Sequence, residues 1–262
     1  MKVYQSEDTI KKIIEYIKKR KGGFYIRFGD GDLNISNNHN DMLNNTTPIF
    51  SNEMIESMKI NDECYFRGFP LMCNKYGLLE DGMFGGNHEW PEKRCDQVVN
   101  YLNTFTSLHE IYTPVAFQYM MTMSPQKCCY YLHILKDIIK SNNCIIIGNK
   151  NLNKRILNLY FSDNYHFIEC PSRNSYNEID RIEKQIIKNI SVSESYYIII
   201  CCAGCTTRVL SKRLFTNRKF YNFFFLDIGS IVDALSGLDT RAYIKLTNFD
   251  NSKFHNMFTS LT

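Results

Sequence analysis

The chain has 262 residues, of which 44% are hydrophobic and 22% charged, with 13 glycines and 6 prolines. This composition excludes a disordered chain, a collagen-like repeat and a small disulfide-stapled scaffold. The formal net charge of +4, from 31 basic and 27 acidic residues, is too small and too mixed to indicate a nucleic-acid groove or an anionic membrane surface.

The sequence shows neither a membrane span nor a signal peptide. Its longest apolar runs, residues 196–205 and 223–228, have the length of buried strands, and residues 1–12 lack the apolar stretch of a signal peptide. We therefore expect a cytoplasmic protein without a transmembrane segment. In that setting, the ten cysteines are expected to be buried thiols.

The first half of the chain predicts helices, short strands and two long loops. Isoleucines at helical spacing predict a helix over about residues 7–20, and a short strand over 24–28 follows. The strand runs into a turn with the sequence Gly29-Asp30-Gly31-Asp32. The remaining expected elements are loops at 34–51 and 82–91, helices at 53–59, 92–104 and 124–140, and a strand at 64–69.

The second half alternates regularly between apolar strands and helices. Strands are predicted at 144–147, 166–170, 196–202 and 223–227, with helices at 152–161, 174–190 and 206–215 and a short helix after Gly229. Such alternation favours a parallel sheet covered on both faces. Because no linker separates the halves, we expect one Rossmann-like α/β domain over residues 1–262, whose mostly parallel sheet could include the first strand.

The strongest local signal is the segment Arg27-Phe28-Gly29-Asp30-Gly31-Asp32. Two carboxylates one residue apart in a glycine-flanked turn can approach one divalent cation, and the glycines allow the backbone to come close to a phosphate. Arg27 adds a forked phosphate donor. A solvated tight turn, whose aspartates bond the backbone, is the structural alternative.

The carboxyl ends of the second-half strands form a second candidate site. They carry Gly148-Asn149, residues 170–174, residues 202–207 and residues 227–230, each mixing small residues with hydroxyls or amides at the start of a helix. Parallel α/β sheets bind ligands at this edge, and helix N-termini favour anions. Each segment alone is equally explained as a helix cap, but together they predict a ligand crevice.

The loop at 82–91 offers candidate general bases. It contains His88-Glu89-Trp90, and Glu80 and Asp81 precede it. A carboxylate or imidazole in such a loop can deprotonate a hydroxyl, although surface charge and a hydrophobic lid are the structural alternatives.

Two other chemistries fit less well. Cys202-Ala203-Gly204-Cys205 has the spacing of a thioredoxin-like redox pair, but all prolines lie at or before Pro171, so the proline loop of that fold is missing. A zinc site would need a second close Cys or His pair, and only Cys128-Cys129 or scattered histidines are available.

The order of four motifs resembles the GT-D-type glycosyltransferases, first known as a bacterial domain family of unknown function. The motifs are R-F-G-D-G-D at 27–32, C-P-S-R-N-S-Y-N-E-I-D at 170–180, A-G-C-T-T at 203–207 and F-L-D-I-G-S at 225–230. The resemblance covers residues 22 to about 235. Asp32 stands where the family usually has Glu, and C-A-G-C-T-T stands where it often has G-P-T-A-T.

The resemblance implies a metal-dependent nucleotide-sugar site on a single Rossmann-like domain. Residues 1–140 would form its metal and acceptor part, and residues 141–262 its nucleotide-binding part. Asp30 and Asp32 would hold Mn²⁺ or Mg²⁺ and the diphosphate-sugar. The residues expected to shape or line the donor site are Arg27, Gly29, Ser172, Asn174, Gly204, Thr206, Asp227 and Gly229.

We therefore expect a glycosyltransferase that moves a hexose from a nucleotide-diphosphate sugar, in the first instance a UDP-sugar, to a hydroxyl of a glycan or glycoconjugate. Asp81, His88 and Glu89 are the candidate bases, and a homo-oligomer is left open. The alternatives are an S-adenosylmethionine-dependent methyltransferase and a non-catalytic nucleotide- or sugar-binding protein of the same fold. The methyltransferase would leave the 27–32 motif unexplained, and Gly148-Asn149-Lys150-Asn151 replaces its glycine-rich turn.

Overall fold

The computed structural model describes residues 1–71, 73–76, 91–117, 125–190, 195–217, 222–238 and 251–260. Within these ranges, the strands are β1 (Lys2–Tyr4), β2 (Gly23–Arg27), β3 (Tyr65–Gly68), β4 (Glu110–Tyr112), β5 (Asn143–Gly148), β6 (Tyr165–Glu169), β7 (Tyr197–Cys201) and β8 (Phe223–Asp227). The α-helices are α1 (Ser6–Lys18), α2 (Asp30–Ser36), α3 (Pro48–Lys59), α4 (Glu92–Asn103), α6 (Pro125–Lys140), α7 (Lys154–Tyr160), α8 (Ile179–Ile190), α9 (Thr206–Thr216), α10 (Ile231–Leu235) and α12 (Asn251–Ser260). The 3₁₀ helices are η1 (Asn74–Tyr76) and η3 (Ser175–Glu178).

The described strands form one eight-stranded sheet in the order β1-β4-β3-β2-β8-β7-β5-β6. Every pair in it is parallel. The first-half strand β2 pairs with the last strand β8, where Phe24 lies opposite Phe225. The expectation of one α/β domain with a parallel sheet that includes the N-terminal strand is therefore confirmed. Strands β1 and β4 were not predicted, because they are only three residues long each.

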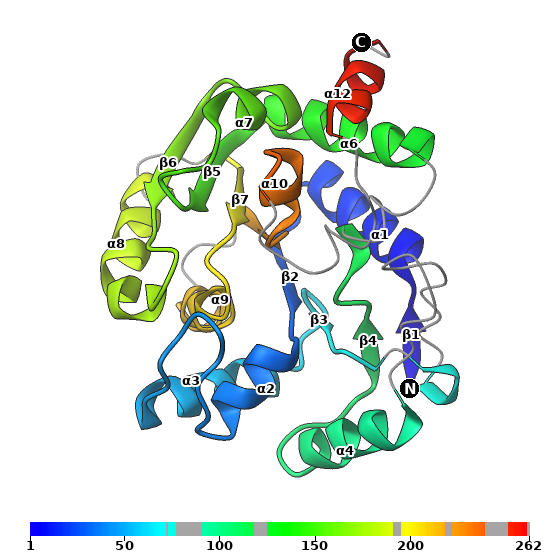
Figure 1. Cartoon of the computed structure of the whole chain (residues 1–262), viewed down its shortest axis with the longest axis vertical. Coiled ribbons are helices and arrows are strands. Elements are labelled where there is room, and N and C mark those ends of the chain that lie inside the picture. Colours follow the sequence, from blue (N-terminus) through cyan, green and yellow to red (C-terminus); the bar gives the residue numbers. More distant parts are fainter. Residues whose placement is uncertain are drawn as a thin grey trace.

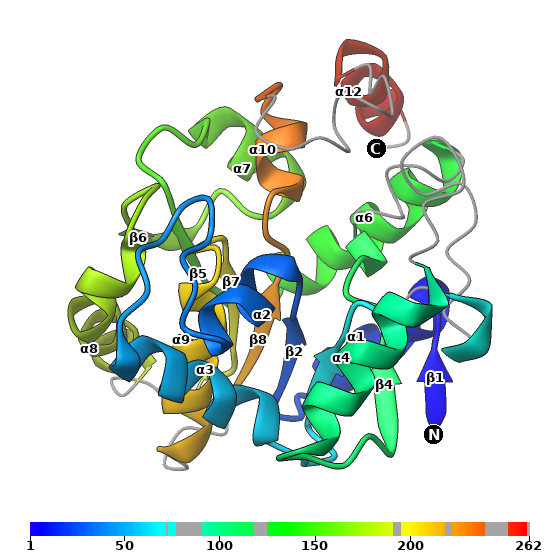
Figure 2. The same ribbon diagram turned by 60° about the horizontal axis from the view of Figure 1, so that its bottom comes forward.

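Both faces of the sheet are buried under helices. Alternate residues of β7 enter different cores, with Ile198 and Ile200 in one and Tyr197 and Ile199 in the other. Helices α1, α6, α7, α10 and α12 contribute to the first core, and α2, α3, α4, α8 and α9 to the second. Figures 1 and 2 show α1 and α6 on one side of the sheet and α2, α3 and α9 on the other. Burial on both faces explains why the strands are continuous apolar runs.

The segment after β2 differs from its prediction. Residues 29–32 were expected to form a turn and 34–51 a loop, but α2 begins at Asp30 and α3 begins at Pro48. The Asp32 carboxylate accepts the Gly29 N–H at 2.7 Å, and the Thr47 hydroxyl accepts the Phe50 N–H at 3.2 Å. These caps satisfy N–H groups that open a helix, so polar sequences become helical.

The described cysteines are free thiols, most of them buried, as expected. Across the described ranges, no helix is both long enough and apolar enough to cross a membrane.

Candidate functional site

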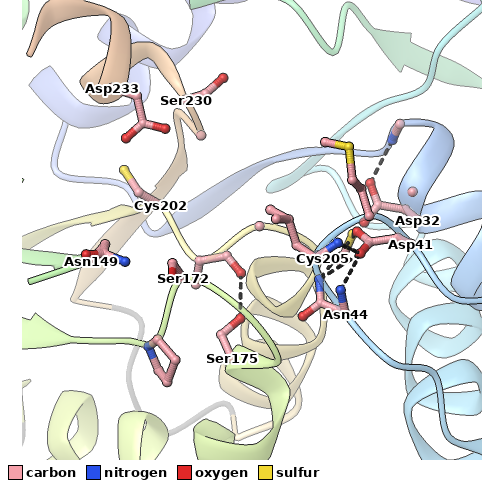
Figure 3. Close-up of a pocket in the computed structure, with 18 of the residues that line it drawn as sticks. Asp32, Asp41, Asn44, Asn149, Ser172, Ser175, Cys202, Cys205, Ser230 and Asp233 are labelled. Carbon is pink, nitrogen blue, oxygen red and sulfur yellow. Dashed lines mark hydrogen bonds between the residues drawn. The ribbon is translucent and has the colours of Figure 1, made fainter. Parts of the chain in front are cut away.

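A cavity of about 520 Å³ lies at the carboxyl ends of the parallel strands. Its described lining comes from the segments after β2, β8, β7, β5 and β6 and from residues 41–44. Figure 3 shows Ser230 and Asp233 at one end of this pocket and Asp32 and Asp41 at the other. Because all strands run in the same direction, their carboxyl ends meet at one edge, as the sequence predicted.

Two glycines with left-handed backbone shape the pocket. Gly229 has φ +55°, and a Cβ there would lie 1.8 Å from Nη2 of Arg27. Gly204 has φ +58° just before α9, and a Cβ there would meet nothing within 4 Å. Glycine is therefore needed at 229 for space and backbone, and at 204 for backbone alone.

Four charged side chains form a buried network behind the pocket, which we call the Arg–Asp cluster: Arg27, Asp32, Arg208 and Asp227. Nε and Nη2 of Arg27 each donate to Oδ1 of Asp227 at 3.2 Å, and the Arg27 N–H donates to its Oδ2 at 3.1 Å. Arg208 pairs with both aspartates, at 3.1 Å from Nη1 to Asp227 Oδ2 and 3.1 Å from Nε to Asp32 Oδ1. All four residues are at most 9% exposed.

Burial and charge oppose each other inside this cluster. Burial raises the pKa of Asp32, since desolvation outweighs the nearby Arg208 charge and the Gly29 N–H. Burial alone would lower the pKa of Arg208, but Asp227 and Asp32 outweigh it and raise that pKa. Arg208 therefore stays cationic, and its charge faces the pocket that it lines.

The two aspartates of the 27–32 motif separate. Asp32, 2% exposed, turns inward to Gly29 and Arg208, whereas the Asp30 side chain is 58% exposed and pairs with Arg94 at 2.9 Å. Asp30 and Asp32 stand at the first and third positions of α2, not in an open turn. In this arrangement the two carboxylates contact different arginines, so their joint binding of one cation stays a prediction.

The separation of Asp30 and Asp32 bears on whether the described residues could hold the divalent metal implied by the resemblance. Across the described residues, no group of three or more His, Cys, Asp or Glu side chains could hold a metal ion. Each motif carboxylate is already paired with a different arginine, and Asp32 is enclosed by the Arg–Asp cluster. Among the described residues, the two motif carboxylates as placed do not converge on one cation, and we derive no step through a metal.

Residues 41–44 close one end of the pocket, a feature missed by the sequence analysis. Oδ1 of Asp41 accepts the N–H groups of Leu43 and Asn44 at 2.5 Å each, and its Oδ2 accepts the Cys205 thiol at 2.9 Å. Gly31 permits this approach, because a Cβ there would lie 2.9 Å from Asp41 Oδ2. An Asp within the polar, Asn-rich segment 34–45 is typical of such a turn and was the available signal.

Asn174 and Thr206 serve the framework of the pocket. The Asn174 N–H donates to Leu43 O at 2.9 Å, and its Oδ1 accepts the Asn45 N–H at 2.8 Å. Thr206 is fully buried, with its hydroxyl 2.7 Å from that of Ser175. These contacts hold residues 41–44 and α9 in place.

The structure thus divides the sequence-predicted residues. Those that line the pocket are Arg27, Gly29, Asp32, Ser172, Gly204 and Gly229. Those outside its described lining are Asp30, Asn174, Thr206 and Asp227. The candidate bases Asp81, His88 and Glu89 lie outside the described residues. Lining residues that the sequence analysis missed include Arg208, Asp41, Ser175 and Asp233.

The cysteines of the pocket do not favour redox chemistry. Burial raises the pKa of Cys202 and Cys205 well above the usual thiol value, so both remain protonated and weakly nucleophilic. The Cys205 thiol is also engaged with Asp41.

Comparisons with known proteins agree on the fold. A family model described as "Glycosyltransferase GT-D fold" matches residues 25–247. A solved structure described as a domain of unknown function 1792 superposes with a TM-score of 0.67 at 16% identity, covering 98% of this chain and 82% of that one. A glycosyltransferase from Streptococcus sanguinis superposes with a TM-score of 0.64 at 18% identity, covering 89% and 82%. A third structure, described as having a distinct glycosyltransferase fold, gives 0.64 at 14% identity, covering 98% and 82%. No curated protein matches the chain by sequence.

Proposed function

Because this chain belongs to the glycosyltransferase GT-D fold family, we propose that it transfers a hexose from a nucleotide-diphosphate sugar to a hydroxyl of a glycan or glycoconjugate. UDP-sugars are the donors to test first. The observation that carries this proposal is the pocket at the strand ends, where a cavity of about 520 Å³ is lined by Arg27 and Arg208. Small-molecule sites have this size, and guanidinium groups match diphosphate oxygens.

The rim of the pocket supports a second substrate beside the donor. Met42, 71% exposed, and Leu238, 38% exposed, both line the pocket. Exposed apolar side chains at a pocket mouth favour contact with a further molecule. An acceptor that packs on them would bring its hydroxyl close to the donor.

Two parts of the sequence-based expectation stay predictions. Mn²⁺ or Mg²⁺ dependence receives no support from the separated Asp30 and Asp32. The general base stays assigned to Asp81, His88 or Glu89. Catalysis at the anomeric carbon needs stabilisation of the departing diphosphate, and buried cations of the Arg–Asp cluster are suited to that role.

The experiment is a turnover measurement with the purified full chain. UDP-, GDP-, CDP- and TDP-hexoses are supplied with a panel of hydroxyl acceptors, and both nucleotide diphosphate release and the hexose adduct are measured. We expect one donor to give both products. If neither product forms and a parallel reaction supplied with S-adenosylmethionine consumes that compound, the result would favour the methyltransferase. Donor binding without turnover would favour a binding protein.

A pocket-filling variant links turnover to the site. Gly204→Phe directs its ring into open space in the pocket and should abolish transfer. Gly237→Phe is the matched control, since Gly237 also has a left-handed φ, of +75°, but does not appear in the described lining. If Gly204→Phe is as active as an active Gly237→Phe control, the reaction takes place outside this pocket.

A further inference from the structure

Arg208 has hydrogen-bonding capacity that the protein leaves unused. Its Nη1 donates to Gly204 O at 2.6 Å and pairs with Asp227, but its Nη2 has no hydrogen-bond partner among the described residues. Its Nε lies 3.1 Å from Oδ1 of Asp32, and yet neither atom makes a hydrogen bond. Buried polar atoms are rarely left in this state, so each one needs an explanation.

Each side-chain nitrogen of the other arginine in the Arg–Asp cluster has a hydrogen-bond partner. Nε and Nη2 of Arg27 both donate to Asp227, and Nη1 donates to Pro114 O at 3.4 Å. Arg27 therefore fixes Asp227, which in turn fixes one side of Arg208. Of the two arginines in the described lining of the pocket, Arg208 is the one with nitrogen atoms that make no hydrogen bond to the described residues.

The position of Arg208 in its helix points to an anionic ligand. It is the third residue of α9, an 11-residue helix whose N-terminus lies against the pocket. The helix dipole disfavours a cation near the helix N-terminus. A bound anion there would be favoured both by the helix dipole and by the charge of Arg208. Gly204, just before the helix, leaves open space at the same place. A bound anion would satisfy Arg208 and the helix end together.

Resting on the proposed function, we propose that the Arg208 guanidinium binds the diphosphate of the donor, that Asp32 positions this guanidinium, and that diphosphate binding does not require a divalent cation. Within the motif at 27–32, Asp32 then contributes to diphosphate binding through its buried contact with Arg208. Arg208 supplies the positive charge that a metal ion would otherwise supply.

The first test uses the wild-type full chain in EDTA. Calorimetry compares UDP, inorganic pyrophosphate and uridine, of which uridine lacks the phosphates. We expect UDP to bind at least tenfold more tightly than uridine, since hydrogen bonds from charged groups carry about that much affinity. UDP binding that appears only on addition of Mn²⁺ or Mg²⁺ would overturn the inference while leaving the proposed function intact. If UDP does not bind, the titration is repeated with GDP, CDP and TDP, and failure of all four to bind with or without metal would overturn both.

The second test uses variants in the same buffer. Arg208→Gln should lose at least tenfold in UDP and pyrophosphate affinity, whereas Arg20→Gln, an exposed arginine that follows α1, removes the same charge as a control. Circular dichroism and the melting temperature monitor folding, and Arg208→Lys supplies a variant that keeps the buried charge. Undiminished pyrophosphate affinity in both folded Arg208 variants would contradict the assignment.

Asp32→Asn separates positioning from folding. A positioning role predicts that the ratio of UDP to uridine affinity falls while uridine affinity is unchanged. A merely structural role would lower both affinities together, and that result would contradict the part assigned to Asp32.

Discussion

At the scale of single residues, the Arg27 guanidinium occupies the space that any side chain at position 229 would need. A side chain at position 229 would have to displace the Arg27 guanidinium. That displacement would break the hydrogen bonds that Arg27 donates to buried Asp227. Of its ion pairs, Asp227 would keep only the one with Arg208, and breaking one arm of such a buried charge network costs about 3 kcal/mol. The Arg–Asp cluster therefore requires glycine at position 229.

Gly229→Ala should therefore destabilise the fold strongly. We expect a loss of about 4 kcal/mol or more, from the left-handed backbone and the broken ion pair together. Gly204→Ala is the matched control, since it has the same backbone strain but open space, and it should lose only about 1–2 kcal/mol. Urea unfolding of both variants measures the difference, and similar losses would show that the contact with Arg27 carries no energy.

Single residues also mark the limit of what the sequence could predict. Arg27 and Asp32 could be predicted as site residues from the charged motif at 27–32, and Gly229 from its place in the segment 227–230 at a strand end. Arg208 was missed, because an arginine inside a helical segment is indistinguishable from a solvated one until the fold buries it. Asp30 and Asp32 were also assigned to one site, since spacing alone does not show which carboxylate turns inward.

At the scale of elements, helices α3, α8 and α9 are joined by an ionic network centred on Glu53. Arg213 of α9 donates to both carboxylate oxygens of Glu53, at 2.9 and 2.8 Å, and Tyr176 donates at 2.5 Å. Burial opposes ionisation of Glu53, but these hydrogen bonds and the Arg213 and Lys212 charges outweigh it and lower the pKa of Glu53. The network therefore fixes α9, which carries Arg208, against α3.

Glu53→Gln should change the acid stability of the protein. Because the folded-state pKa lies below the unfolded one, Glu53 contributes stability above about pH 4.5, and this contribution is lost as pH falls through the folded value. The variant should lose about 1–2 kcal/mol at pH 7 and show a smaller further loss between about pH 5 and 3. Glu56→Gln, on the same helix with one ion pair to Lys212, is the control. Parallel pH profiles for wild type and Glu53→Gln would contradict this role.

The sequence predicted the elements unevenly, for a physical reason. The core strands and most helices followed from apolar runs and helical periodicity. Helix α2 did not, because its residues are mostly polar and its N-terminus depends on the Asp32 carboxylate and the Gly29 N–H. Short strands such as β1 are held by pairing with β4, and that pairing is not visible in three residues.

At the scale of the whole molecule, one continuous sheet joins the two halves of the sequence. The pairing of β2 with β8 places Arg27 and Asp32 from the first half beside Gly204 and Arg208 from the second. The pocket thus draws on both halves, whereas the family resemblance implied that residues 141–262 bind the nucleotide. The order of strands decides this, and it depends on pairing between segments about 200 residues apart.

The whole-molecule arrangement also limits where each substrate can lie. Ser230 and Asp233 line one end of the pocket, and Asp32 and Asp41 the other. Arg208 belongs to the second end through its contact with Asp32. A donor whose diphosphate contacts Arg208 would extend from that end along the strand termini.

The most direct measurement is a crystal structure of the full chain with a bound UDP-hexose, grown in EDTA. We predict density for the donor along the carboxyl ends of β2, β8, β7 and β5, with phosphate oxygens within hydrogen-bond distance of Arg208. A donor bound away from these strand ends, or a diphosphate that leaves Arg208 without contact, would contradict this prediction.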